Sequence, residues 1–399
     1  MTTHPPGRRR QLWTLYAAGF VTAFGAHAVA ANLAGFAHGH HTSMVELGVL
    51  LALYDGAEVL LKPVFGTLAD RIGAKAVMLG GLIGFAIVSA LFVVAADPGL
   101  LGAARFGQGA AAAAFSPAAG AMVAALGGRR NRGRAFGGYG GAKGLGYLAG
   151  PVVGGALVRV GGYSVLFAAL AALAAVVAVL VATVPPVPVE GRSRETLAGL
   201  ARRLRSPAFV QPVVILGAGT AALSAGVGFL PVMGERAHLD PFATGAVVSL
   251  LAVTAAVVQP RVGARLDALG GNSTRLARFA ILVAATGFGV GAVAAGPFAL
   301  VGAAVLIGAG VGASTPIGFS LLADGAPAGR LGQTMGAGEV GRELGDAGGP
   351  LLVGAVAGAS LGAGFALLGA ALVIAAASCR KVGPPPGAGQ PPMATARAG

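Results

Sequence analysis

The feature that most limits how this chain can fold is a series of apolar runs, each about 20 residues long, that recurs along its length. A run of that length matches one α-helix crossing the hydrocarbon core of a bilayer. Charged residues make up only 11% of the 399 residues, and hydrophobic residues make up 55%. A soluble domain uses about 25% charged residues, so the composition excludes an ordinary globular chain and a disordered one. We therefore interpret the chain as an integral membrane protein.

The runs predict an all-α fold with twelve membrane-spanning helices. They are continuous and rich in Ala, Leu, Val and Gly, whereas the strands of a membrane barrel alternate apolar and polar residues over about ten positions. The predicted spans are residues 12–37, 44–68, 75–96, 99–126, 134–158, 163–184, 208–233, 243–264, 274–295, 298–323, 331–357 and 360–379.

Basic residues are divided very unevenly between the two sides of these spans. If residue 1 lies in the cytoplasm, 21 Lys and Arg residues fall inside, and only Arg159 and Arg236 fall outside. Cytoplasmic loops hold the Lys/Arg excess in membrane proteins, so we expect both termini in the cytoplasm. The excess of Arg over Lys, with abundant Ala and Gly, suggests a GC-rich bacterial genome and hence a plasma membrane. The net charge of +14 marks one membrane face, and we expect no nucleic-acid partner because no aromatic platform accompanies the bases.

Two sets of residues recur about 200 positions apart and predict a duplicated six-helix unit. Gly66, Asp70 and Gly73 recur as Gly263, Asp267 and Gly270, at an offset of 197. At an offset of 199, the residues Gly109, Pro117, Lys143, Gly146, Gly150, Pro151 and Gly154 recur as Gly308, Pro316, Arg342, Gly345, Gly349, Pro350 and Gly354.

Six spans per copy is an even number, so the two halves are parallel repeats that can rock against one another around a central site. We expect an N-terminal six-helix bundle over residues 1–184 and a C-terminal six-helix bundle over residues 208–379. A cytoplasmic linker, residues 185–207, joins them, and residues 380–399 form a disordered Pro/Gly-rich tail.

Three motifs resemble those of the major facilitator superfamily. Residues 66–75, GTLADRIGAK, resemble the family's signature G-x-L-x-D-R-x-G-R-K, and residues 101–109, with Arg105 and Gln108, are similar to its fourth-span pattern. Residues 146–155, GYLAGPVVGG, resemble the fifth-span pattern of the proton-coupled drug-efflux antiporters of that superfamily. The resemblance implies a secondary transporter that is energised by a proton gradient and needs no cofactor.

The resemblance also implies a cytoplasmic latch that joins two helices when the transporter faces outward. Its candidate residues are Gly66, Asp70, Arg71, Gly73, Lys75 and, in the second copy, Asp267. The chemistry suits this role, because a carboxylate near a helix N-terminus and a guanidinium can pair across moving elements. A solvated loop with no such role is the alternative.

Nine charged side chains fall well inside predicted spans, away from their ends, where each costs about 2.5–3.5 kcal/mol on insertion scales unless it pairs or faces water. They are Asp55, Glu58, Lys62, Arg105, Lys143, Glu339, Arg342, Glu343 and Asp346. Helical spacing predicts ion pairs between Glu58 and Lys62 and between Arg342 and Asp346, which are four residues apart. Asp55 and Glu343 have no base at such a spacing.

A carboxyl group that titrates near neutrality can carry a proton across the membrane. Our candidates for proton coupling are Asp55, Glu58, Glu339 and Glu343, with Arg105, which the resemblance implies assists proton transfer, and His27, an imidazole in the first span. The alternative is that the charged residues are internal ion pairs that only fix helix packing, and that His27 is a packed polar residue.

Lys143 lies four residues from both Tyr139 and Tyr147, so one helix face presents a base between two aromatic rings. This face suits an aromatic or anionic substrate, although simple packing explains it equally well. Arg342, Asp346, Asn32 and Gln108 complete the candidate substrate cavity, which we expect to be roomy and largely apolar. Helix bends are predicted at Gly146, Gly150, Pro151, Gly154, Gly349 and Pro350.

Three histidines, His38, His40 and His41, lie in the first outer loop with Glu46 nearby. Imidazoles at this density could ligate a transition metal, but no downstream ligands complete a site, so we expect an exposed loop and no metal centre.

Together these features predict an antiporter that exports small amphipathic or lipophilic compounds in exchange for protons, as multidrug exporters do, by rocking of its two halves. We expect a monomer in the lipid bilayer, with a small-molecule substrate and protons as its partners. Efflux of a sugar, a metabolite or a divalent metal ion stays open, as does a non-transporting scaffold or receptor. No nucleophile–base pair or metal-ligand set predicts an enzyme.

Overall fold

A computed structural model describes residues 6–39, 44–93, 98–186, 197–239, 241–269, 274–293, 296–357 and 360–380. Within these ranges every regular element is a helix, which confirms the predicted all-α fold. The helices are α1 (Pro6–Gly39), α2 (Met44–Ile72), α3 (Ala74–Leu91), α4 (Pro98–Gly127), α5 (Arg132–Ala182), α6 (Leu197–Leu204), α7 (Pro207–Arg236), α8 (Pro241–Ala268), α9 (Thr274–Val293), α10 (Pro297–Asp324), α11 (Leu331–Ala357) and α12 (Leu361–Ser378).

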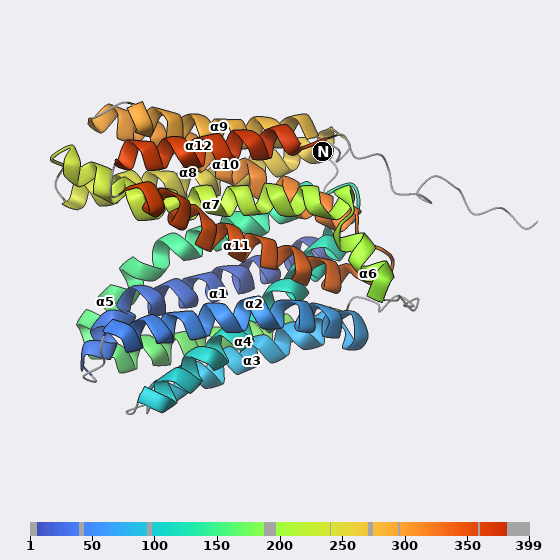
Figure 1. The fold of residues 1–399 in the computed structure, drawn as a ribbon. Coiled ribbons are helices and arrows are strands. Elements are labelled where there is room, and N and C mark those ends of the chain that lie inside the picture. The colour runs from blue at the N-terminus through green and yellow to red at the C-terminus, as the bar shows by residue number, and fades with distance from the viewer. Residues whose placement is uncertain are drawn as a thin grey trace, which may run out of the picture.

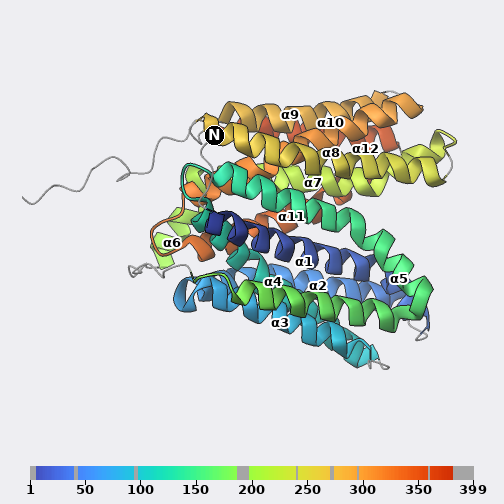
Figure 2. The same ribbon diagram turned by 180° about the vertical axis from the view of Figure 1, so that it is seen from behind.

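The helices form two bundles that lie side by side along a common seam (Figure 1). One hydrophobic core is built mainly from α1 to α5, and the other from α7 to α12. Across the seam α2 contacts α11, and α5 contacts α8, as Figure 2 shows from behind. The short helix α6 lies in the segment predicted as the linker, at one end of the molecule.

Helix α5 contains both the fifth and the sixth predicted spans. Its backbone leaves helical geometry at Gly161 and Gly162, and Gly162 has a φ of 74°, which glycine adopts without the strain that a Cβ would cause. The two arms of α5 therefore serve as two spans. With these arms taken separately and α6 set aside, the described helices supply the twelve predicted spans.

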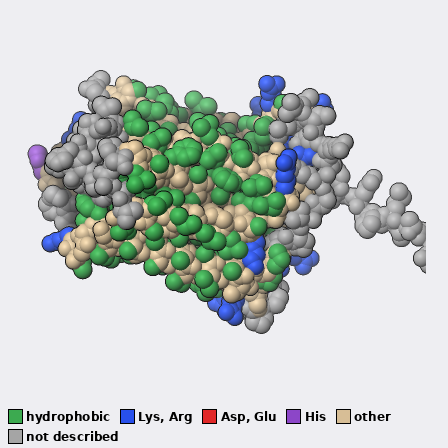
Figure 3. Space-filling view, turned by 90° about the horizontal axis from the view of Figure 1, so that it is seen from below, with side chains coloured by type: hydrophobic (Ala, Val, Ile, Leu, Met, Phe, Trp, Pro, Cys, Tyr) green, Lys and Arg blue, Asp and Glu red, His purple; other side chains and the backbone are tan. Residues whose placement is uncertain are grey.

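Nine helices of the described chain are long and apolar enough to cross a bilayer, with α5 among them. Helices α2 and α11 are long enough too, but they carry most of the embedded charges that the sequence singled out. Hydrophobic side chains cover the middle of the face seen in Figure 3, and Lys and Arg lie toward its ends. The apolar residues Val160, Val293 and Phe298 are 85%, 89% and 92% exposed, as suits contact with lipid.

The glycines of the fifth-span motif let α5 approach α1 closely. A Cβ at Gly146 would lie 2.5 Å from the carbonyl oxygen of Phe20, and one at Gly150 would lie 2.8 Å from that of Phe24. In the second copy, Gly345 and Gly349 bring α11 against α7 in the same way. Each repeated motif thus packs one seam helix against a helix of its own bundle, as small residues do in membrane helix pairs.

We predict that Gly146→Ala destabilises the protein by about 1–3 kcal/mol, because its Cβ would meet backbone atoms of α1 that cannot move aside. The matched control is Gly155→Ala on the same helix, where the nearest atom would be 3.8 Å away. The thermal unfolding midpoint of purified protein in detergent measures the difference. Equal midpoints for the two variants would contradict close α1–α5 packing at Gly146.

Candidate functional site

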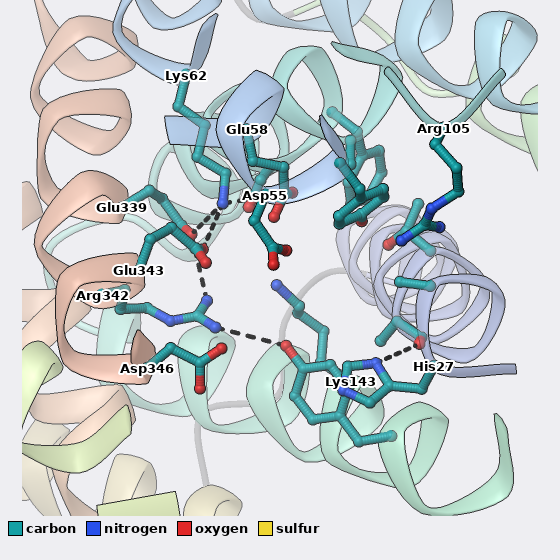
Figure 4. A pocket seen from close by; sticks show the side chains of 18 residues that line it. His27, Asp55, Glu58, Lys62, Arg105, Lys143, Glu339, Arg342, Glu343 and Asp346 are labelled. Carbon is teal, nitrogen blue, oxygen red and sulfur yellow. Dashed lines mark hydrogen bonds and ion pairs between the residues drawn. The ribbon is translucent and has the colours of Figure 1, made fainter. Parts of the chain in front are cut away.

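A cavity of about 200 Å³ lies at the seam, lined by side chains of α1, α2, α4, α5 and α11 (Figure 4). Ten of its lining residues are acids, bases or histidine: His27, Asp55, Glu58, Lys62, Arg105, Lys143, Glu339, Arg342, Glu343 and Asp346. The predicted largely apolar lining is therefore wrong. The few charges of this chain are concentrated here, although they are sparse elsewhere in its spans. His27, Asp55 and Asp346 are exposed although they lie within helices, so the cavity admits water.

Lys62 is the centre of an ion cluster that joins the two bundles. Its ammonium nitrogen lies 2.5 Å from Glu343 Oε1, 3.4 Å from Glu58 Oε1 and 3.6 Å from Glu339 Oε2. Glu58 comes from α2, as the sequence predicts, but Glu339 and Glu343 come from α11. Glu343, which has no base at helical spacing on its own helix, pairs with a base 281 residues away in the chain. Lys62 is only 2% exposed, so these three carboxylates replace water around it.

Arg342 extends this cluster toward α5. Its guanidinium donates to Glu339 Oε2 at 3.2 Å and lies 3.5 Å from the hydroxyl of Tyr147. The predicted pair with Asp346 is wrong, since Glu339 on the previous turn takes the guanidinium. Asp346 is instead hydrogen-bonded to Ser224 of α7.

Arg105 is buried between α4 and α2. It donates to the Leu50 carbonyl at 3.2 Å and to Gln108 Oε1 at 3.0 Å, and its guanidinium lies 4.6 Å from the centre of the Tyr54 ring. Gln108 therefore holds Arg105 in place and does not line the cavity. The side chain of Arg105 still reaches the cavity wall, so its suggested part in proton transfer stays a prediction.

Three aromatic or polar candidates surround the α5 side of the cavity. Lys143 lies 5.8 Å from the centre of the Tyr139 ring, which is buried behind it. His27 faces Tyr147, with ring centres 4.3 Å apart, and its Nδ1 lies 3.1 Å from the Ala23 carbonyl. The amide of Asn32 donates to its own helix, so neither Asn32 nor Tyr139 lines the cavity.

The cavity is also unbalanced in charge. Its lining contains five carboxylates, Asp55, Glu58, Glu339, Glu343 and Asp346, and four bases, Lys62, Arg105, Lys143 and Arg342. With all nine groups ionised, one negative charge has no counterpart in the cavity wall. An uncompensated charge in a low-dielectric site is costly, so the cavity favours binding of a proton or of a cationic group.

Two carboxylates cap helix N-termini across the seam, at the same end of the molecule. Asp70 accepts from the backbone N–H groups of Gly332 at 2.6 Å and Gln333 at 2.8 Å, in the first turn of α11. Asp267 accepts from Gly133 at 2.7 Å and Arg134 at 2.8 Å, in the first turn of α5. These N–H groups have no acceptor within their own helix, and the helix dipole favours a negative charge there.

The other predicted latch residues differ in whether they contact the opposite bundle. A Cβ at Gly66 would meet the carbonyl of Gly332, and Gly73 has a φ of 98° in the turn before α3. Lys75 donates to the Ala182 carbonyl at 2.7 Å, which is a contact within the first bundle. Arg71 is exposed and forms no hydrogen bond or ion pair within the described residues.

The guanidinium that pairs across the seam belongs to Arg132, with Asp324 at the end of α10. Sequence reasoning missed this pair, because Arg132 is one of four arginines in a short loop and nothing local distinguishes it. It also missed Arg203 of α6, which donates to Gln333 Oε1 at 2.9 Å and to Thr334 Oγ1 at 3.1 Å, next to the Asp70 cap. His40 and His41 lie outside the described residues, as does most of the predicted tail, and the side chains of His38 and Glu46 are not described.

Comparison with known proteins gives the family. Residues 15–350 match the family model described as Major Facilitator Superfamily. This chain belongs to the major facilitator superfamily. Its fold and family are those of membrane-embedded transporters of small molecules, which are not enzymes.

Its curated relatives include antibiotic resistance proteins. Tetracycline resistance protein, class C, of Escherichia coli is 37% identical over 122 residues, which is 31% of each chain. Quinolone resistance protein NorA of Staphylococcus aureus is 28% identical over 115 residues, or 29% of this chain and 30% of NorA. The matches thus span less than a third of the length of these relatives.

Solved structures share the fold along almost the whole chain. The human organic anion transporter MFSD10 has a TM-score of 0.77 at 17% identity, covering 94% of this chain and 100% of that one. The Escherichia coli fucose:proton symporter FucP has a TM-score of 0.77 at 16% identity, covering 93% and 98%. At these identities the likeness concerns the fold alone.

We predict that Lys62→Met destabilises the protein by about 3–5 kcal/mol, because one buried and two partly buried carboxylates lose their shared cation. Lys62→Arg should retain most of the stability, and adding Glu343→Gln to Lys62→Met should restore part of it. Unfolding midpoints in detergent measure these changes, with exposed Arg236→Met as the control. A Lys62→Met protein as stable as the control would contradict the cluster.

We predict that Asp70→Asn raises the fraction of molecules open at the capped end about five- to thirty-fold, because a charged cap of two helix N–H groups is worth about 1–2 kcal/mol. Spin labels at Arg130 and Ala328, placed in a Cys379→Ala background, report the distance between the bundles there. Arg71→Gln is the matched control and should change nothing. A distance distribution unaltered by Asp70→Asn would refute the cap.

Proposed function

We propose that this chain is a proton-coupled antiporter that exports small amphipathic compounds across a bacterial plasma membrane. The charge imbalance of the cavity is the main support: five carboxylates face four bases. A proton can supply the missing positive charge, and so can the cationic group of a substrate. The polar lining favours amphipathic substrates over purely lipophilic ones, because an apolar ligand would leave this charge uncompensated.

Coupling follows from competition for the same negative charge. Asp55 is the strongest candidate for the shared site, because it is exposed to the cavity and has no hydrogen bond or ion pair with the described residues. A proton on Asp55 lowers the affinity for a cationic group, and a bound cationic group displaces the proton. Since only one of them occupies the site at a time, the two move in opposite directions. The energy source is the proton gradient, without a cofactor, and the chain works as a monomer.

Alternating access is supported by the two caps. If the end rich in Lys and Arg faces the cytoplasm, both caps and the Arg132–Asp324 pair close the cytoplasmic side, and the cavity belongs to an outward-facing state. Four capping hydrogen bonds, each worth about 0.5–1.5 kcal/mol net, must break for inward opening. The gain or loss of one paired charge at the Lys62 cluster can change the free energy by a similar amount.

The names of the relatives agree with export. Besides tetracycline and quinolone resistance proteins, they include a probable actinorhodin transporter of Streptomyces coelicolor, which is 39% identical over 105 residues, covering 26% of this chain and 18% of that one. Tetracycline and quinolones are therefore suitable first probes.

We predict that purified protein in liposomes with an acidic interior accumulates at least one of these probes, and that Asp55→Asn reduces this accumulation at least tenfold while downhill exchange continues. Probe uptake and the release of internal protons are recorded together. The matched control is Glu235→Gln, an exposed acid at the end of α7. Accumulation that persists after the pH difference is collapsed would refute proton coupling. So would intact pH dependence when Asp55, Glu58, Glu339 and Glu343 are each replaced by the corresponding amide.

A further inference from the structure

We propose that the transported compounds are amphoteric, with a cationic group that binds Asp55 and an anionic group that binds Lys143. This inference rests on the proposed antiport and names the substrate class of the same cavity. Both side chains point into the cavity, Asp55 from α2 and Lys143 from α5 (Figure 4).

Asp55 and Lys143 stand out because the other charged groups of the cavity are already engaged. Of the nine charged side chains in its lining, seven have a charged or hydrogen-bonding partner within the protein. Asp55 and Lys143 form no hydrogen bond or ion pair with the part of the chain that the structure describes, and they do not pair with each other. The cavity wall thus presents one free acid and one free base.

Two free charges of opposite sign suit a ligand that also has two. A simple cation would pair with Asp55 and leave Lys143 without a direct partner, and a simple anion would do the reverse. A dipolar ion pairs with both groups at once, because each of its ends meets the opposite charge. The pair is therefore a specificity device, since any ligand with a single charge leaves one group unpaired in a partly desolvated site.

The surroundings of the two groups agree with this assignment. Beside Lys143, the rings of His27 and Tyr147 form an aromatic surface, and Arg342 lies 3.5 Å from the Tyr147 hydroxyl, so this side suits a carboxylate or phenolate on a flat ring. Asp55 itself is exposed to the cavity, so its end of the cavity suits an amine. A volume of about 200 Å³ suits a small compound.

The proposal has an electrical consequence that separates it from cation export. A dipolar ion has no net charge, so exchanging it for one proton moves one positive charge across the membrane. Exchange of a monovalent cation for one proton moves none. Export of an amphoteric compound must therefore respond to membrane potential as well as to a pH difference.

Two matched triplets test the substrate class by equilibrium binding to the purified full-length protein. The first triplet shares a phenyl skeleton: phenylalanine has both charges, 2-phenylethylamine has only the positive one and 3-phenylpropionate has only the negative one. The second triplet repeats this order on the larger indole ring, with tryptophan, tryptamine and indole-3-propionate. We expect the dipolar member of at least one triplet to bind at least tenfold more tightly than its two partners.

Variants assign each charge. Asp55→Asn should remove the advantage of the dipolar compound over the anion, and Lys143→Met should remove its advantage over the cation. Lys143→Arg should restore that advantage, which a merely structural role of Lys143 would not predict. Glu235→Gln and Arg236→Met, which change exposed charges at the end of α7, should leave all affinities unchanged.

The binding and transport experiments distinguish a failure of the substrate class from a failure of the proposed antiport. If the dipolar compounds bind preferentially but a pH difference does not drive their transport, the proposed substrate class is supported and the proposed antiport is refuted. If antiport is found but the cation of each triplet binds best, or transport of the bound compound ignores a potassium diffusion potential, the amphoteric class is wrong. It is also wrong if no member of either triplet binds, or if Lys143→Met keeps the preference of the intact protein.

Discussion

The structure depends on one arrangement, a buried ammonium that holds carboxylates from both halves of the molecule. Lys62 joins α2 to α11, the two long helices with the most embedded charge. Facing lipid, those charges would cost several kcal/mol each, so the two helices must lie together at the centre. The same pair is capped at one end by Asp70. Ionic contact in the middle of the seam and closure at its end thus lie on the same two helices, so a change in charge at the cavity acts directly on the elements that must separate.

The duplication makes the second seam similar in backbone and different in chemistry. Where α5 meets α8, Asp267 provides the corresponding cap, and the position equivalent to Lys62 is Gln259. The positions equivalent to Glu339 and Glu343 are glycines, and a Cβ at one of them, Gly140, would collide with the Gln259 amide. Apart from its cap, this seam is close-packed and has no counterpart of the Lys62 ion cluster. Charge changes in the cavity therefore act on one seam, while the other can serve as an almost passive hinge.

How much the sequence predicted depended on the range of each interaction. The spans and the all-α fold follow from local apolar length, and the capping acids Asp70 and Asp267 follow from a recurring motif. Partners across the seam cannot be predicted in this way, because helical spacing relates only residues of the same helix. Glu343 therefore looked unpaired, and Arg71 looked like the pairing guanidinium in place of Arg132. The polar cavity was missed for a related reason: average composition describes the lipid-facing surface, whereas packing gathers the few charges at one place.

The repeat also explains why one base in the cavity is left without an acid. Lys143 and Arg342 occupy equivalent positions of the two copies, and Arg342 is compensated by Glu339, three residues before it. The position three residues before Lys143 is Gly140, where a Cβ would meet the amide end of the Gln259 side chain of α8. The acid that compensates Arg342 in the second copy therefore has no counterpart beside Lys143. Lys143 therefore faces the cavity without an acid of its own repeat, and Asp55 of α2 is a group of opposite charge in the same cavity.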